Sequence, residues 1–270
     1  MTGIALDLGS ARTRAWTSRR RMILDVPTVT FHGGGAVYPI RRGAIVDTPG
    51  TARMLDRLLG HRLPRFGRPL LILTAPVLGG VAYRAQARVA VEVLRPRNVL
   101  TIPTARAVAS AADADLTRPL LVVDIGAHLT EVALLADGAV VDARHTALGT
   151  ADLDGLEVGG LVVDGVAVDR LAADGVVASP TDRIIDCVVA MVTAMLEQDR
   201  NSRTLTLEAL RRGALLAGGG ALLPGVSYGL AGQLHAPVQP VPAPHTAAVR
   251  GAAKLLRAAS AHPSAAVYSH

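Results

Sequence analysis

A short motif occurs twice in this chain, 117 residues apart, and it limits the folds that are open to the sequence. Each copy is an apolar strand that ends in an aspartate, followed by x-Gly, a tight turn and a returning strand. The two aspartates are Asp7 and Asp124. A repeat at this distance predicts two related halves, each built around its own sheet.

The pattern between the repeats is typical of an α/β protein. P-L-L-I-L-T and P-L-L-V-V-D, at residues 69–74 and 119–124, are continuous apolar strands of the kind covered on both faces. Helical periodicity predicts helices at residues 50–59, 80–94, 104–114, 182–198, 205–212, 224–234 and 245–259. Residues 25–47 and 155–181 are Gly-rich and have no helix-length pattern, although Asp164-Gly165 predicts a hairpin turn.

The composition excludes several classes of function. Half of the 270 residues are hydrophobic, but aromatic residues make up 3%, so base stacking cannot be a main binding mode and no nucleic-acid partner is expected. The net charge of +6 is carried almost entirely by arginine, because Lys254 is the only lysine. Cys187 lies in an apolar helical pattern and is expected to be a buried structural thiol. Without a secretory signal or a membrane span, the sequence predicts a cytoplasmic protein.

Three Gly-containing turns follow apolar strands and predict a phosphate site. They read D-L-G-S-A-R-T at residues 7–13, D-I-G-A-H-L-T-E at 124–131 and A-G-G-G-A-L-L at 217–223. Small residues there let backbone N–H groups approach an anion closely. Asp7 and Asp124 could hold a Mg²⁺ ion through its waters, although capping of the turn is the alternative.

At these motifs the sequence resembles the superfamily of actins, sugar kinases and heat-shock chaperone ATPases, and most of all the bacterial MreB family. R-R-G-A-I-V-D-T at residues 41–48, G-G-G-A-L-L-P-G at 218–225 and H-T-A-A-V-R-G-A-A-K at 245–254 carry the same resemblance. It implies an actin-like, ribonuclease H-like α/β fold with two duplicated subdomains. Their mixed five-stranded sheets would enclose a nucleotide cleft.

The resemblance also implies subdomain boundaries and roles for individual residues. Subdomain I would comprise residues 1–118 and 245–270, and subdomain II residues 119–244. The residues expected at the nucleotide phosphates are Gly9, Ser10, Ala11, Arg12, Thr13, Arg14, Gly126, Ala127 and His128. The residues expected at the adenosine are Gly218, Gly219 and Gly220.

One of these residues, Arg14, falls where actins carry a phosphate-contacting lysine. It is therefore the candidate cation for the β- and γ-phosphates, with a solvated hairpin arginine as the alternative. Arg12 lies at the tip of the same turn.

The sequence departs from the family in three places. Subdomain IB is reduced to residues 25–47 and subdomain IIB to residues 155–181. In the second phosphate turn, Ala127, His128 and Leu129 replace a run of glycines and restrict the backbone. Thr104 stands where the family places the Glu or Gln that orients the attacking water, and no carboxylate or Gln lies between Glu92 and Asp113.

These observations predict an MreB-like cytoskeletal or scaffold protein with a vestigial or weak site for ATP or ADP with Mg²⁺. At most it would be a very weak ATPase.

Self-association into filaments or oligomers is expected, and a membrane surface or another cytoskeletal protein is the alternative partner. Arg19, Arg20 and Arg21 could contact phospholipid or form a solvated turn. A nucleotide-independent adaptor and a short chaperone-like relative remain as alternative functions; a small-molecule kinase is less compatible with the missing carboxylate base.

Overall fold

The chain folds into two compact units: it passes from the first unit to the second and then returns to the first. The computed structural model describes residues 2–32, 35–63, 67–153, 161–163, 166–168, 179–199 and 204–261. Unit 1 comprises Met1–Ala111 and Ala248–His270, and unit 2 comprises Ala112–Ala247. The N-terminal and C-terminal segments therefore belong to the same unit, and the second unit is inserted between them in the sequence.

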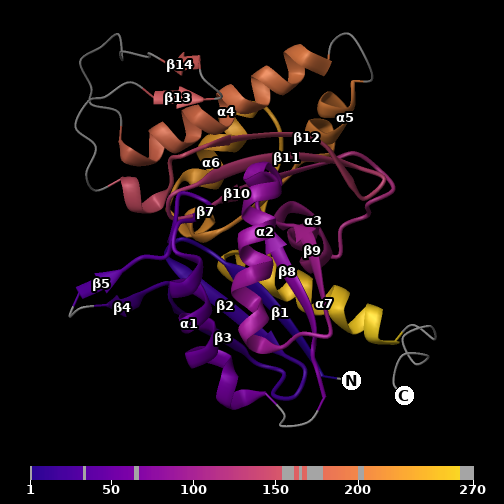
Figure 1. Ribbon diagram of the computed structural model, residues 1–270. Helices are drawn as coiled ribbons and strands as arrows, with labels where there is room; N and C mark the ends of the chain where they lie inside the picture. The colour runs from indigo at the N-terminus through magenta and orange to yellow at the C-terminus, as the bar shows by residue number, and fades with distance from the viewer. Residues whose placement is uncertain are drawn as a thin grey trace. The chain divides into compact units, whose positions relative to one another are not determined.

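Unit 1 is built on a mixed five-stranded sheet. Its strands are β1 (Gly3–Leu8), β2 (Arg12–Thr17), β3 (Ile23–Pro27), β8 (Leu70–Ala75) and β9 (Asn98–Pro103), in the order β3-β2-β1-β8-β9 (Figure 1). β1, β2 and β3 form an antiparallel meander, whereas β8 and β9 run parallel to β1. The aspartate of the first motif, Asp7, thus lies at the carboxyl end of a central strand.

Helices cover both faces of this sheet because the strands alternate apolar side chains between them. Ile4, Leu6 and Leu71 face the core shared with α1 (Thr48–Leu59) and α2 (Gly80–Val91). Ala5, Trp16 and Ile72 pack instead against α7 (Ala247–Ala261). α1 begins where the side chain of Asp47 accepts a hydrogen bond from the N–H of Gly50.

Two small hairpins lie within residues 25–47, the stretch predicted to be a reduced subdomain IB. β4 (Thr30–His32) pairs with β5 (Gly35–Val37), and β6 (Ile40–Arg41) pairs with β7 (Ala44–Ile45), both antiparallel. α3 (Thr104–Ala111) follows β9 directly. It ends three residues before the predicted boundary at residue 114, and Asp113 beyond it has a left-handed backbone.

Unit 2 repeats the architecture of unit 1. Its sheet contains β10 (Leu120–Ile125), β11 (Thr130–Ala136), β12 (Ala139–Thr146), β15 (Ala214–Ala217) and β16 (Val238–Pro240), in the order β12-β11-β10-β15-β16. Again the first three strands form an antiparallel meander and the last two run parallel to the central strand. The predicted pair of mixed five-stranded sheets is confirmed.

Three helices form the core of unit 2 with one face of its sheet. They are α4 (Pro180–Asp199), α5 (Leu205–Arg212) and α6 (Val226–Leu234). Cys187 of α4 is fully buried, and burial raises the pKa of its thiol to about 12, as expected for a structural cysteine. Single 3₁₀ turns lie at Gly60–Arg62, Val77–Gly79, Glu92–Leu94, Thr150–Asp152, Gly219–Leu222 and Pro244–Thr246.

Within residues 155–181, the described strands are β13 (Leu161–Val163) and β14 (Val166–Val168), which pair antiparallel. The turn predicted at Asp164-Gly165 falls outside the described residues. None of the described helices is long and apolar enough to cross a membrane.

The two units carry opposite net charge. Unit 1 holds 20 of the 28 basic residues of the sequence and 5 of the 22 acidic ones, a formal charge of +15. Unit 2 holds the other 8 basic and 17 acidic residues, a formal charge of −9. The net charge of the whole chain is therefore smaller in magnitude than that of either unit, because the charges of the two units have opposite signs.

Candidate functional site

The two phosphate-type turns have the same backbone geometry. The N–H of Gly9 donates to the carbonyl of Arg12 at 3.1 Å, and the N–H of Gly126 donates to that of Leu129 at 2.8 Å. Each turn also accepts a hydrogen bond from a residue outside it. In unit 1, Thr28 Oγ1 donates to the Gly9 carbonyl at 2.7 Å. In unit 2, the N–H of Thr150 donates to the Gly126 carbonyl at 3.0 Å. The repeated sequence motif is thus a repeated structure.

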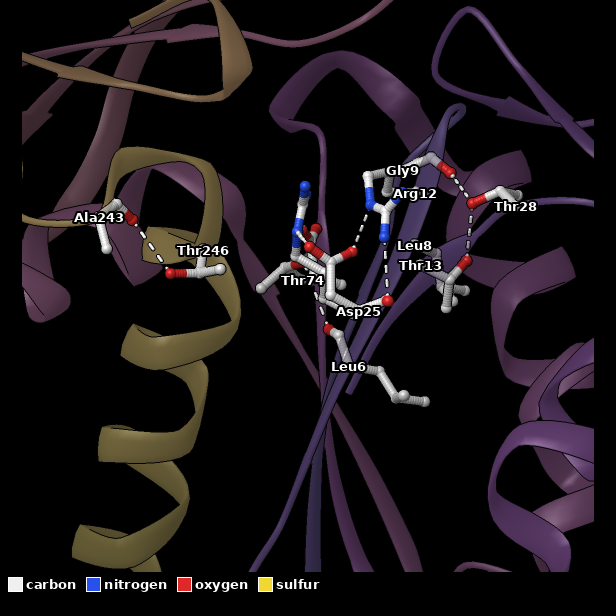
Figure 2. Close-up of polar contacts among 12 residues, drawn as sticks. Leu6, Leu8, Gly9, Arg12, Thr13, Asp25, Thr28, Thr74, Ala243 and Thr246 are labelled. Atoms are coloured by element: carbon white, nitrogen blue, oxygen red, sulfur yellow. Dashed lines mark hydrogen bonds and ion pairs between the residues drawn. The ribbon is translucent and has the colours of Figure 1, made fainter. Parts of the chain in front are cut away.

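In unit 1, one carboxylate holds both arginines of the first turn. Arg12 donates from Nε to Oδ1 of Asp25 at 2.6 Å and from Nη2 to its main-chain oxygen at 3.0 Å (Figure 2). Arg14 places Nε 3.2 Å from Oδ2 of the same carboxylate. Both arginines are therefore ion-paired with Asp25 in this structure, and the assignment of Arg14 to the phosphates stays a prediction.

Asp7 is held by Thr74 and Arg14. Thr74 Oγ1 donates to Oδ1 of Asp7 at 2.8 Å, and Nη1 of Arg14 lies 3.8 Å from Oδ2. Burial raises the pKa of Asp7, and the nearby Arg14 and the Thr74 hydrogen bond offset this only in part. A guanidinium at this distance adds a fixed positive charge beside the carboxylate and disfavours a second, divalent cation there.

Asp25 has the opposite electrostatic environment. Partial burial acts to raise its pKa, but the hydrogen bond and charge of Arg12, with the charge of Arg14, outweigh burial and lower the pKa. A lowered pKa means that the ionised form stabilises the fold. That contribution is complete above the ordinary pKa of about 4 and is lost as the pH falls through the lowered value.

We expect Asp25→Asn to lower the free energy of unfolding by about 1–2 kcal/mol at pH 7, since the charge-assisted bonds are lost while the site stays partly exposed to solvent. The deficit relative to the wild type should shrink as the pH falls below about 4. Urea denaturation between pH 3 and pH 7 measures it. The control is Glu92→Gln, which removes an exposed carboxylate; a deficit that stays constant with pH would contradict the assignment.

The same three cross-strand positions carry different side chains in the two units. In unit 1 the row is Asp7, Arg14 and Asp25, on β1, β2 and β3. In unit 2 the row is Asp124, Glu131 and His145, on β10, β11 and β12. Glu131 is buried, with 5% of its surface exposed. The duplicated backbone therefore supports a row with an arginine at its centre in one unit and a glutamate in the other.

The third Gly turn lies directly against the end of the second. Gly218 has a φ of 84°, and a Cβ there would lie 2.5 Å from Oδ1 of Asp124 and 2.6 Å from the carbonyl carbon of Ile125. A Cβ on Gly220 would lie 2.6 Å from Cβ of Ile125. Gly219 is exposed, and a Cβ added to it would have no other atom within 4 Å. Two of the three glycines are thus required by packing, and Gly219 alone presents open space.

Thr104 is the first residue of α3 and is buried, with 7% of its surface exposed. Its hydroxyl is uncharged and shorter than the Glu or Gln side chain that orients the attacking water in such enzymes. Among the residues that the structure describes, no three His, Cys, Asp or Glu side chains are grouped so that they could hold a metal ion directly.

Within unit 1 the structure brings together Asp7, Arg12 and Arg14; within unit 2 it brings together Asp124 and the Gly218–220 turn. Sequence reasoning missed Asp25 and Thr74, which hold the candidate residues of unit 1. No fixed spacing in the sequence identifies a carboxylate on another strand, because its partner depends on the register of β2 and β3.

Comparison with known proteins agrees with this geometry. The family model of the MreB/Mbl protein matches residues 34–158. Over these residues the chain is similar to the MreB/Mbl family. The matched stretch includes the second Gly-containing turn, whereas the first turn and the Gly218–220 turn lie outside it. No curated protein matches the sequence.

Solved structures share the whole fold. MreB5 of Spiroplasma citri bound to ADP is 16% identical, with a TM-score of 0.74 over 97% of this chain and 99% of that one. The MamK double helical filament is 16% identical, with a TM-score of 0.70 over the same shares. The ethanolamine utilization protein EutJ from Carboxydothermus hydrogenoformans is 16% identical, with a TM-score of 0.61 over 94% and 89%. At this identity the likeness establishes an actin-like fold for this chain.

Proposed function

We propose that this chain is an actin-like cytoskeletal or scaffold protein that self-assembles and whose nucleotide site is vestigial. In this proposal unit 1 corresponds to actin-like subdomain I and unit 2 to subdomain II. The observation that carries the proposal is the state of the first phosphate turn, where Asp25 already binds both Arg12 and Arg14. A chain with this turn would keep the MreB-like fold, but Arg12 and Arg14 would already be paired with Asp25 and would not be available to bind phosphate.

Any nucleotide bound by this chain would be ATP or ADP, held weakly. Its phosphates would contact the backbone of the two turns, at residues 9–14 and 126–128, and its adenosine would lie on the Gly218–220 turn. Asp7 and Asp124 would hold Mg²⁺ through its waters, with Arg14 3.8 Å from Asp7. With Thr104 in place of the hydrolytic residue, ATP turnover would be undetectable or far slower than in MreB.

The opposite charges of the two units support self-association. Unit 1 of one copy, at +15, attracts unit 2 of another copy, at −9, whereas like units repel. A contact between unlike surfaces is heterologous and leaves each molecule with a free binding face, so it propagates into an open filament unless the rotation between copies closes a ring. This attraction does not involve the nucleotide, and salt weakens it because the Debye length falls to about 3 Å at 1 M.

The test is sedimentation of the purified chain with ATP, ADP or no nucleotide, at low and high salt, with electron microscopy of the pellets. We expect equal amounts of polymer or oligomer in the three nucleotide states, and less at high salt. Phosphate release measured on the same samples should stay at background. Polymer that forms only with ATP would overturn the proposal.

The same site supports a second candidate function, a nucleotide-independent adaptor in the cytoplasm. Neutralised arginines and a buried Thr104 are compatible with a fold that is kept for binding a protein partner or a membrane surface. A strict monomer at high concentration in the sedimentation experiment would favour the adaptor over the scaffold.

A further inference from the structure

We propose that Asp25 is an internal competitor for the first turn: its carboxylate occupies the faces of Arg12 and Arg14 that a polyphosphate would contact, and so determines which anions the turn accepts. The inference rests on the proposed function only in assuming that this turn faces the phosphates of a ligand. It adds a specificity residue that the sequence motifs do not contain.

The contacts of Asp25 resemble those of a bound anion. Its Oδ1 accepts from Nε of Arg12 at 2.6 Å (Figure 2). Its Oδ2 lies 3.2 Å from Nε of Arg14. The main-chain oxygen of Asp25 accepts a second hydrogen bond from Arg12 at 3.0 Å. The carboxylate thus accepts a hydrogen bond from Arg12 and is ion-paired with Arg14, whose buried Nε makes no hydrogen bond. A pair of phosphate oxygens would contact the same two guanidinium groups.

The backbone fixes this carboxylate in place. Asp25 faces Arg14 in the register of β3 and β2, and Arg14 faces Asp7 in the register of β2 and β1. An intramolecular group held in this way competes at a high effective concentration, without the entropy cost of association. A weakly charged anion therefore cannot displace it, whereas a polyphosphate with several charges competes more effectively.

The two arginines differ in their accessibility. The side chain of Arg12 is 44% exposed, and that of Arg14 is 15% exposed and also lies near Asp7. A ligand would therefore displace Asp25 from Arg12 first. The expected effect of removing the carboxylate should depend on Arg12, which makes a double substitution informative.

The experiment compares binding of inorganic tripolyphosphate and of Mg-ATP to four proteins by calorimetry at low salt. They are the wild type, Asp25→Asn, the charge-matched control Glu92→Gln, and Asp25→Asn combined with Arg12→Gln. We expect Asp25→Asn to bind tripolyphosphate about tenfold more tightly than the wild type, because the negative charge that competes for Arg12 is then removed. Glu92→Gln should bind like the wild type, and the double variant should lose the gain.

Equal affinities of Asp25→Asn and Glu92→Gln would overturn the proposal, because the gain would then come from net charge alone. A gain that persists in the double variant would also overturn it. If Mg-ATP gains less than tripolyphosphate, the polyphosphate itself is the recognised group; an equal gain shows that the nucleoside does not interfere. Both results support displacement of Asp25.

A measurement on the unsubstituted protein covers the case in which Asp25→Asn does not fold. In ¹⁵N-labelled wild type, the Nε–H resonance of Arg12 should shift as tripolyphosphate is added, and that of Arg14 should shift less. Unchanged Arg12 resonances at saturating tripolyphosphate would refute the competition. The sedimentation experiment tests self-assembly separately, so a failure of the proposed function and a failure of this inference give different results.

Discussion

Gly251→Ala is expected to lower the free energy of unfolding of unit 1 by about 3 kcal/mol. Gly251 lies inside α7, where that helix crosses α3, and a Cβ there would overlap the backbone of Ala107, 2.5 Å from its carbonyl carbon. Backbone cannot turn aside as a flexible side chain can, so the two helices must separate. The separation would also break the bond from Nζ of Lys254 to the Ser110 carbonyl, 3.1 Å long.

The single tryptophan of the chain gives a direct measurement of this effect. Trp16 packs against α7 in unit 1, and the guanidinium of Arg257 lies 5.9 Å from its ring centre. Urea denaturation followed by Trp16 fluorescence therefore reports on the affected core. A midpoint equal to that of the wild type would show that α7 and α3 are less closely packed than the structure indicates.

Gly232→Ala is the matched control, because it makes the same change in another helix with the opposite expected result. Gly232 lies in α6, and a Cβ at that position would have no other atom within 4 Å. Alanine is favoured over glycine in a helix by about 0.5–1 kcal/mol, so this variant should be slightly more stable. Circular dichroism follows both variants on the same scale.

Gly218→Ala is expected to destabilise unit 2 by about 3 kcal/mol, because it combines two costs. The φ of 84° is strained for any residue with a Cβ, and the added carbon would press on the main chain of Ile125. Since Ile125 ends β10, the strain should reach the second phosphate turn. Chemical denaturation followed by circular dichroism measures the loss.

Gly219→Ala separates packing from ligand binding in the same turn. Its Cβ would meet open space, so the free energy of unfolding should change by less than about 0.5 kcal/mol. If adenosine lies on this turn, Gly219→Ala should weaken ATP binding without loss of stability. Equal destabilisation by Gly218→Ala and Gly219→Ala would contradict the role assigned to the backbone of Ile125.

The sequence predicted those features that repeat or follow a strong hydrophobic pattern. The apolar segments at residues 69–74 and 119–124 form the interior strands β8 and β10, within a residue of the predicted ends. The parallel edge strand β16 was not recognised individually. It lies between Pro237 and Pro242 and itself ends in a proline, and prolines are tolerated in a sheet mainly at such an edge.

The site was less predictable than the fold, since its contacts depend on strand register. The residues of the turns could be named from the motifs, but the partner of Arg14 could not. Arg21 adopts a left-handed backbone in the turn between β2 and β3, which helps to set the pairing of Arg14 with Asp25. A slip of one residue would move Asp25 to the other face of the sheet, and no local pattern in the sequence excludes that slip.

The paired rows Asp7–Arg14–Asp25 and Asp124–Glu131–His145 have a consequence for how such a molecule can evolve. Strand order and the hydrogen bond across each turn are the same in both units, so they belong to the inherited framework. The charges on the rows differ, although the backbone beneath them does not. Mutation can therefore change one half of the duplicated protein while the other half keeps its chemistry, without a change of fold in either.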